Sequence, residues 1–125
     1  MRLVAAALLA LLLTAWPVGA QLSSELSPEE LLASIELSQD VMPDEPLVAE
    51  FAERLDALEQ HCAEDRRTLA DLVAGIHREL ADHDVQHSVR YAAAGLEAAS
   101  EDLPAGSNCT DLATAYASTI LNAVG

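Results

Sequence analysis

The chain contains no lysine, and its six basic residues are all arginines, set against 21 aspartates and glutamates. The resulting formal charge of −15 at pH 7 repels nucleic-acid phosphates and anionic lipid surfaces. Aromatic residues are also scarce, with one Trp, two Tyr and one Phe, so stacking platforms for bases, sugars or flat cofactors are few. Both deficits argue against nucleic-acid binding and leave a basic or apolar protein as the expected kind of partner.

The sequence also lacks the short motifs that commonly accompany catalysis. It contains no Gly-x-Ser-x-Gly, no glycine-rich phosphate loop and no Cys-x-x-Cys. Its acidic residues follow the spacing of a solvated helix face, and no two of them are indicated as a general acid and base pair. We therefore expect a non-enzymatic protein, with no catalytic residue and no tightly bound cofactor.

The longest apolar run covers residues 3–15 and follows the basic residue Arg2. Small residues after this run are typical of a signal-peptidase site before Gln21. The run is also short for a transmembrane helix, which needs about 20 apolar residues. We predict a cleavable signal peptide over residues 1–20, export to the periplasm or the cell exterior, no membrane span after cleavage, and a single helical domain over residues 21–125.

Apolar residues recur at helical spacing through the rest of the chain, without strand-like alternation or internal repeats. The first helix has a complete start signal, in which Ser27 is the N-cap, Pro28 occupies the first turn and Glu30 completes a capping box. Pro43 is expected to end it. The four expected helices cover residues 28–42, 46–82, 85–101 and 109–123. The sequence thus predicts an all-α bundle of about four helices, one of them long.

The long helix is predicted because its apolar stripe keeps one phase from residue 47 to residue 80, within an arc of about 100°. Asp65 and Arg66 fill a gap in this stripe between Cys62 and Leu69, so a kink or a short break is allowed near residues 63–67. The next stripe starts at Val85 and lies about 160° out of phase. One helix cannot bury both stripes, so we place a turn at residues 82–84, with Asp82 or Asp84 as the new cap.

The last helix begins after a loop of Gly, Ser and Pro residues, with Asn108 as its N-cap. Its apolar stripe comprises Leu112, Tyr116, Ile120 and either Val124 or Ala123.

Cys62 and Cys109 are the only two cysteines, and in an exported protein they are expected to be joined. If the helix over 85–101 returns antiparallel to the long helix, its end lies level with residue 66, since both helices rise about 1.5 Å per residue. The following loop then brings Cys109 to Cys62. A structural disulfide is therefore favoured over a redox-active or metal-bound pair.

Three of the four histidines lie in the segment Gly75–His87, together with three carboxylates. His83 and His87 have i, i+4 spacing, and Asp84 precedes His87 by three residues, as in helical metal sites. The stripe that begins at Val85, however, places both histidines on an exposed face. Weak binding of a divalent transition metal by His83, His87 and Asp84 is therefore an alternative hypothesis.

The leading interpretation is a small exported acidic helical protein that binds another protein of the cell envelope or exterior. Its acidic surface or an apolar groove of the bundle would make the contact. The alternative is a metal-binding or metal-responsive periplasmic protein. A third hypothesis is an acid-responsive chaperone, in which protonation of the carboxylates and histidines loosens the bundle. The sequence specifies neither the partner nor the oligomeric state.

Overall fold

The computed structural model describes residues 26–124, and this range contains five α-helices and no strand. The helices are α2 (Pro28–Leu37), α3 (Pro46–His61), α4 (Arg66–Asp82), α5 (Val89–Ser100) and α6 (Cys109–Val124). The predicted all-α architecture is confirmed, but the bundle has five helices where four were expected. The predicted signal peptide and its cleavage site before Gln21 lie outside the described residues. Within residues 26–124, no helix combines the length and hydropathy needed to cross a bilayer.

Helix α2 starts as predicted and ends earlier. The side chain of Ser27 accepts a hydrogen bond from the N–H of Glu30 at 3.1 Å, and the N–H of Ser27 donates to the Glu30 carboxylate at 3.2 Å. The predicted end at residue 42 is wrong, because Ser38 adopts a left-handed backbone with φ of 55° and closes the helix after Leu37. Residues 39–45 then form the turn that leads to α3.

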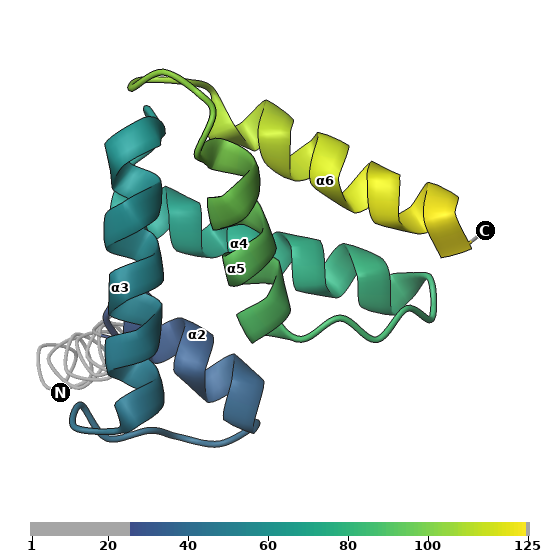
Figure 1. The fold of residues 1–125 in the computed structure, drawn as a ribbon. Helices are drawn as coiled ribbons and strands as arrows, with labels where there is room; N and C mark the ends of the chain where they lie inside the picture. The colour runs from purple at the N-terminus through teal and green to yellow at the C-terminus, as the bar shows by residue number, and fades with distance from the viewer. Residues whose placement is uncertain (1–25, 125) are drawn as a thin grey trace, which may run out of the picture.

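The predicted single helix over 46–82 is also wrong, since α3 and α4 are separate helices (Figure 1). Cys62 has an extended backbone, with φ of −101° and ψ of 145°, and so ends α3. Asp65 then starts α4, because its side chain accepts a hydrogen bond from the N–H of Thr68 at 2.8 Å. The break falls in the polar gap where the sequence allowed a kink.

Helix α5 begins at Val89, later than the predicted residue 85. Ser88 is its N-cap and accepts a hydrogen bond from the N–H of Tyr91 at 3.1 Å. The predicted cap at Asp82 or Asp84 is therefore wrong. Instead, Asp84 has a positive φ of 61° and lies in the segment that connects α4 to α5.

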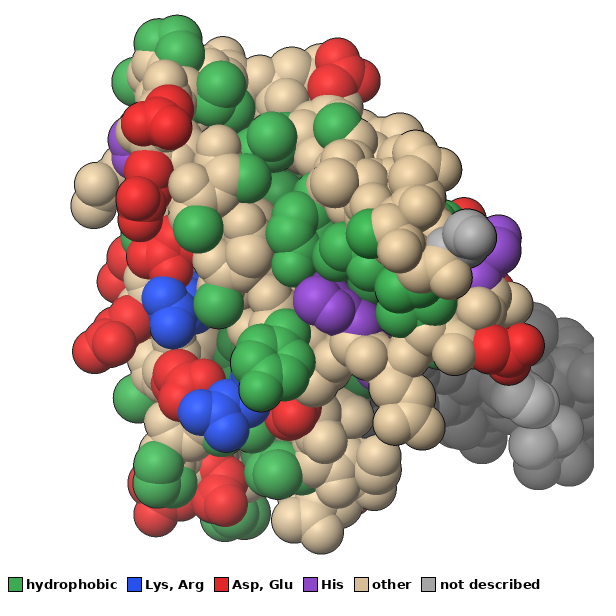
Figure 2. All heavy atoms as spheres, turned by 45° about the vertical axis from the view of Figure 1, so that its right-hand side comes forward, with side chains coloured by type: hydrophobic (Ala, Val, Ile, Leu, Met, Phe, Trp, Pro, Cys, Tyr) green, Lys and Arg blue, Asp and Glu red, His purple; other side chains and the backbone are tan. Residues whose placement is uncertain are grey.

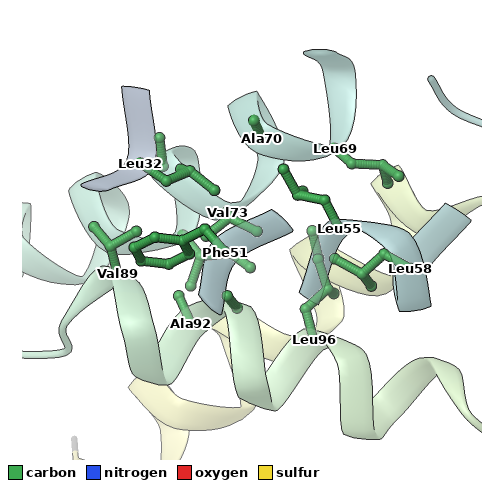
Figure 3. Packing of buried hydrophobic residues seen from close by; sticks show 14 of the residues in the cluster. Leu32, Phe51, Leu55, Leu58, Leu69, Ala70, Val73, Val89, Ala92 and Leu96 are labelled. Carbon is green, nitrogen blue, oxygen red and sulfur yellow. The ribbon is translucent and has the colours of Figure 1, made fainter. Parts of the chain in front are cut away.

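The core lies between α2, α3, α4 and α5, and Figure 3 shows their apolar side chains converging. The largest fully buried side chains are Phe51, Leu32, Leu55, Leu58, Leu69, Leu80, Leu96, Val73 and Val89. Of the other four helices described, α6 packs against α4 and α5, on the outside of this core. It contributes mainly small buried residues, namely Cys109, Ala113 and Ala117.

Cys62 and Cys109 lie at disulfide distance, with their Cα atoms 5.4 Å apart, as the sequence predicted. Two backbone hydrogen bonds flank the disulfide. The N–H of Ala63 donates to the carbonyl of Ser107 at 2.8 Å, and the N–H of Ser107 donates to the carbonyl of His61 at 2.9 Å. The junction between α3 and α4 is thus fastened to the loop that precedes α6.

Candidate functional site

The histidine segment does not bring the predicted metal ligands together. His83 is exposed, and its Nδ1 donates to the carbonyl of Glu79 at 2.9 Å. His87 is partly buried and contacts Tyr116 instead. Among residues 26–124, the one group of Cys, His, Asp or Glu donor atoms within 4.8 Å of one another belongs to Cys62, Glu64 and Cys109. The geometry therefore lends no support to a site at His83, His87 and Asp84, and that site stays a prediction.

The group at Cys62, Glu64 and Cys109 has a structural role in this state of the protein. Its two sulfur atoms are joined to each other, and the carboxylate of Glu64 caps the first turn of α6. One carboxylate oxygen accepts from the N–H of Cys109 at 3.1 Å, and the other accepts from the N–H and hydroxyl of Thr110 at 2.8 and 2.7 Å. Asn108 adds the predicted cap by accepting from the N–H of Asp111 at 3.1 Å.

The pKa of Glu64 reflects this role. Burial raises the pKa of the carboxyl group, but hydrogen bonds from Thr110 and Cys109 outweigh that effect and leave the pKa below its ordinary value. The carboxylate is therefore charged at neutral pH, and its negative charge interacts favourably with the positive, N-terminal end of the α6 dipole.

A second cluster, formed by His77, His87, Tyr91 and Tyr116, holds the middle of α6. His77 donates from Nδ1 to the carbonyl of His87 at 2.8 Å, and the hydroxyl of Tyr116 donates to the carbonyl of Tyr91 at 3.5 Å. The Tyr116 hydroxyl also lies 2.9 Å from Nε2 of His87. The donor in this hydrogen bond is either Nε2 or the hydroxyl, according to the tautomer of the neutral His87 imidazole.

The surroundings of His87 and Tyr116 favour the uncharged form of both side chains. Burial lowers the pKa of His87, and repulsion from His77 lowers it further. Burial also raises the pKa of Tyr116. Gly95 makes room for the tyrosine, since a Cβ atom at that position would overlap the Tyr116 ring. The contacts of Tyr116 with His87 and Tyr91 therefore hold α6 against α5 and the segment that precedes it.

A groove of about 350 Å³ runs between α4 and α6. Its apolar and small lining residues are Leu72, Gly75, Ile76, Ala113, Ala117 and Leu121. Its polar edges are formed by Asp71 and Glu79 on α4 and by Thr110, Thr114 and Ser118 on α6. None of its lining residues within 26–124 is basic. A Cβ atom added at Gly75 would meet no other atom within 4 Å, so the groove is open at this point.

The groove is linear, because its lining residues recur at each helical turn. On α6 they extend from Thr110 to Leu121, which corresponds to about 16 Å along the helix axis. On α4 they extend from Asp71 to Glu79, or about 12 Å. The groove thus presents apolar surface between two helices and has one acidic edge, on α4.

A second hollow, between α3 and α5, is polar and already has internal charge partners. Arg90 makes two hydrogen bonds of 2.8 Å to the carboxylate of Glu50, and Arg54 pairs with Glu97. On the face in Figure 2, acidic side chains surround the arginines, while histidines lie beside hydrophobic side chains. Because both of its arginines are already paired, this hollow is a weaker candidate than the groove.

The sequence indicated some of the groove and missed the rest. Leu72 and Ile76 belong to the predicted apolar stripe, and Ile76 lies in the core, as expected, with Leu72 packed against it. Ala113 and Ala117 were not singled out, because the larger side chains of Leu112, Tyr116 and Ile120 define a stronger stripe on α6. The available signal was the run of small residues, Gly75 on one helix and two alanines on the other, beside those larger side chains.

Comparisons of the chain with protein-family models, with curated proteins and with solved structures gave no match. The geometry of the groove and the two clusters that hold α6 in place are therefore the basis for assigning a function.

Proposed function

We propose that this protein is a non-enzymatic interaction module, which holds a segment of a partner protein in the groove between α4 and α6. The observation that carries the proposal is the groove itself, with its apolar and small lining residues and an acidic edge. Its volume of about 350 Å³ falls within the usual range for binding sites. Removal of its apolar surface from water on binding would contribute about 25 cal/mol per Å² before the entropic costs of association.

The fixed position of α6 supports a binding role. Glu64 and the disulfide hold the start of this helix, and the contact between His87 and Tyr116 holds its middle. A groove whose walls are already in place loses little conformational entropy when a partner binds. The protein would act in the periplasm or outside the cell, where a disulfide such as Cys62–Cys109 persists.

Site-specific photocrosslinking in the producing cells tests this function. A benzophenone amino acid replaces Ser118, an exposed residue at the edge of the groove, and a control chain carries it at Glu53, an exposed residue of α3. We expect a discrete protein adduct from position 118 only. The adduct should disappear in the Gly75→Leu background, because the leucine side chain would fill the groove. Equal adducts from both positions, or none, would contradict the proposal.

A further inference from the structure

We infer that the segment bound in the α4–α6 groove is an amphipathic α-helix whose basic residues face α4. This inference rests on the proposed function and names the chemistry of the partner. It follows from the shape of the groove, from the size of its lining residues and from the distribution of charge along its two edges.

The shape and lining of the groove favour a helix. Helix side chains form both walls, and the groove follows them for about three turns of α6. An extended peptide is usually held by main-chain hydrogen bonds to a sheet edge, and residues 26–124 contain no sheet. Gly75, Ala113 and Ala117 have little or no side chain, so the axis of a docked helix can approach to the usual distance of about 8–10 Å.

The charge of the groove predicts the pattern of the partner. Asp71 and Glu79 are the charged lining residues, and both belong to α4. Their separation of about 12 Å along the axis corresponds to seven or eight residues of a docked helix. We therefore expect basic residues at i and i+7 along the side that faces α4, and apolar residues on the adjoining side that enters the groove, at i+1, i+5 and i+8. The α6 edge carries only hydroxyl groups and requires no charge on the partner.

A second copy of this chain is a poor occupant. Its formal charge of −15 repels an identical molecule. Moreover, Arg54, Arg66 and Arg90 are already paired with carboxylates of their own molecule. A basic helix from another protein satisfies the acidic edge without this repulsion.

Fluorescence anisotropy with designed peptides tests the inference. The full chain is expressed with export, purified and mixed with a labelled helical peptide that carries arginines at i and i+7 and leucines at i+1, i+5 and i+8. Comparison peptides replace the arginines with glutamine or glutamate, or scramble the sequence so that the composition is kept and the amphipathic face is lost. We expect the arginine peptide to bind most tightly, the glutamine peptide about fivefold more weakly, and the other two not measurably.

Protein variants place the binding in the groove. Gly75→Leu, and independently Ser118→Trp, should weaken the binding of the arginine peptide by about tenfold or more. The double variant Asp71→Asn, Glu79→Gln should weaken it about fivefold, whereas the matched double variant Glu53→Gln, Glu101→Gln, which removes the same charge elsewhere, should leave it unchanged. Circular dichroism and urea unfolding of each variant separate lost binding from lost folding.

Several results would overturn the inference. Equal binding of the scrambled peptide would show non-specific attraction to an acidic surface, and equal binding of the glutamine peptide would remove the role of Asp71 and Glu79. Binding of a fluorescent fatty acid that Gly75→Leu abolishes, without peptide binding, would identify a lipid ligand instead. If the crosslink from position 118 persists while no helical peptide binds, the protein-binding function stands and the helical partner is wrong.

Discussion

Two glycines in helices have opposite surroundings and should respond oppositely to the same substitution. At Gly75 an added Cβ atom meets nothing within 4 Å, whereas at Gly95 it overlaps the ring of Tyr116. We expect Gly75→Ala to raise the free energy of unfolding by about 0.5–1 kcal/mol, because alanine favours the helix. Gly95→Ala should lower it by about 1–3 kcal/mol, because the tyrosine must leave its contact with His87. Urea unfolding measures both values, and a shift of the same sign in both variants would refute the placement of Tyr116.

His87 should make the stability of the protein depend on pH in the mildly acidic range. Its pKa is lowered in the folded state, so the unfolded chain binds the proton more readily. Stability is therefore complete above the ordinary pKa of about 6.5 and falls as the pH decreases from there through the lowered folded-state pKa. Tyr91 and Tyr116 lie against the ring of His87, and His77 is close enough to lower its pKa. His77 and His87 also line a hollow beside the segment that connects α4 to α5, and the acidic residues in its lining are Glu36 and Asp84.

The variant His87→Gln tests this dependence, because the glutamine amide can donate or accept a hydrogen bond at Tyr116 but does not titrate. Between pH 7.5 and pH 5, the urea midpoint of the variant should decrease less than that of the unmodified protein. His83→Gln is the control, since His83 is exposed and makes only a contact with Glu79 within its own turn. Identical pH profiles for His87→Gln and the unmodified protein would exclude the proposed neutral pair.

Glu64 should confer stability that is lost in acid. Its folded-state pKa is lowered, so its contribution is present above its ordinary pKa of 4.5 and disappears as the pH decreases through the folded value. At neutral pH, Glu64→Ala should lower the free energy of unfolding by about 1 kcal/mol through loss of the α6 cap. Glu53→Ala, at an exposed position in α3, is the matched control. Thermal unfolding at pH 7 and pH 3.5 measures the effect, and equal losses at both pH values would contradict the role of the charged carboxylate.

At the scale of helices, apolar periodicity predicted which residues are buried better than it predicted where helices end. Phe51 and Leu55 before the break, and Val73 and Leu80 after it, are all fully buried and share one predicted stripe. The stripe stays in phase because α3 and α4 face the same core. Periodicity reports the buried face, so it could not reveal a break between two helices that share that face. The spacing Asp65-x-x-Thr68 was the local signal for a new helix start.

The position of α6 and the groove beside it depend on contacts that are distant in sequence. Glu64 caps a helix that begins 45 residues later, and the interaction of His87 with Tyr116 spans 29 residues. No local pattern indicates such pairs. The disulfide was predictable because its two partners are the only cysteines in the chain. The disulfide determines where the start of α6 lies, but it does not determine which side of α6 faces α4. The groove could therefore not be predicted from the sequence.

Loss of the disulfide should release α6 and its preceding loop before the rest of the protein. The two cysteines are 47 residues apart, and a loop of this length contributes about 4 kcal/mol in the chain-entropy model. In the double variant Cys62→Ser, Cys109→Ser we expect the free energy of unfolding, measured in urea, to decrease by about this amount. Amide exchange should accelerate first in residues 101–124, because α6 packs outside the main core on α4 and α5 alone. Uniform acceleration across α3, α5 and α6 would show instead that α6 unfolds together with the core.

At the scale of the whole molecule, the charge is unbalanced and the few cations are concentrated in local networks. Arg66 alone contacts Glu29, Asp56 and Glu59, and Arg90 binds Glu50. Each of these arginines neutralises carboxylates that lie next to it. Most of the 21 acidic residues therefore repel one another across the surface of a small protein.

This repulsion predicts opposite effects of salt on folding and on binding. The screening length is about 30 Å at 0.01 M salt and about 8 Å at 0.15 M, so added salt first relieves repulsion between distant carboxylates. We expect the melting temperature to rise by about 5 °C over this range, and the affinity for the basic helical peptide to fall. The chlorides of lithium, sodium and potassium should act alike, because screening depends on ionic strength. If a micromolar concentration of zinc or nickel raised the melting temperature as much, and His83→Ala with His87→Ala removed that effect, the histidines would bind a metal after all and screening would not be the main source of stabilisation.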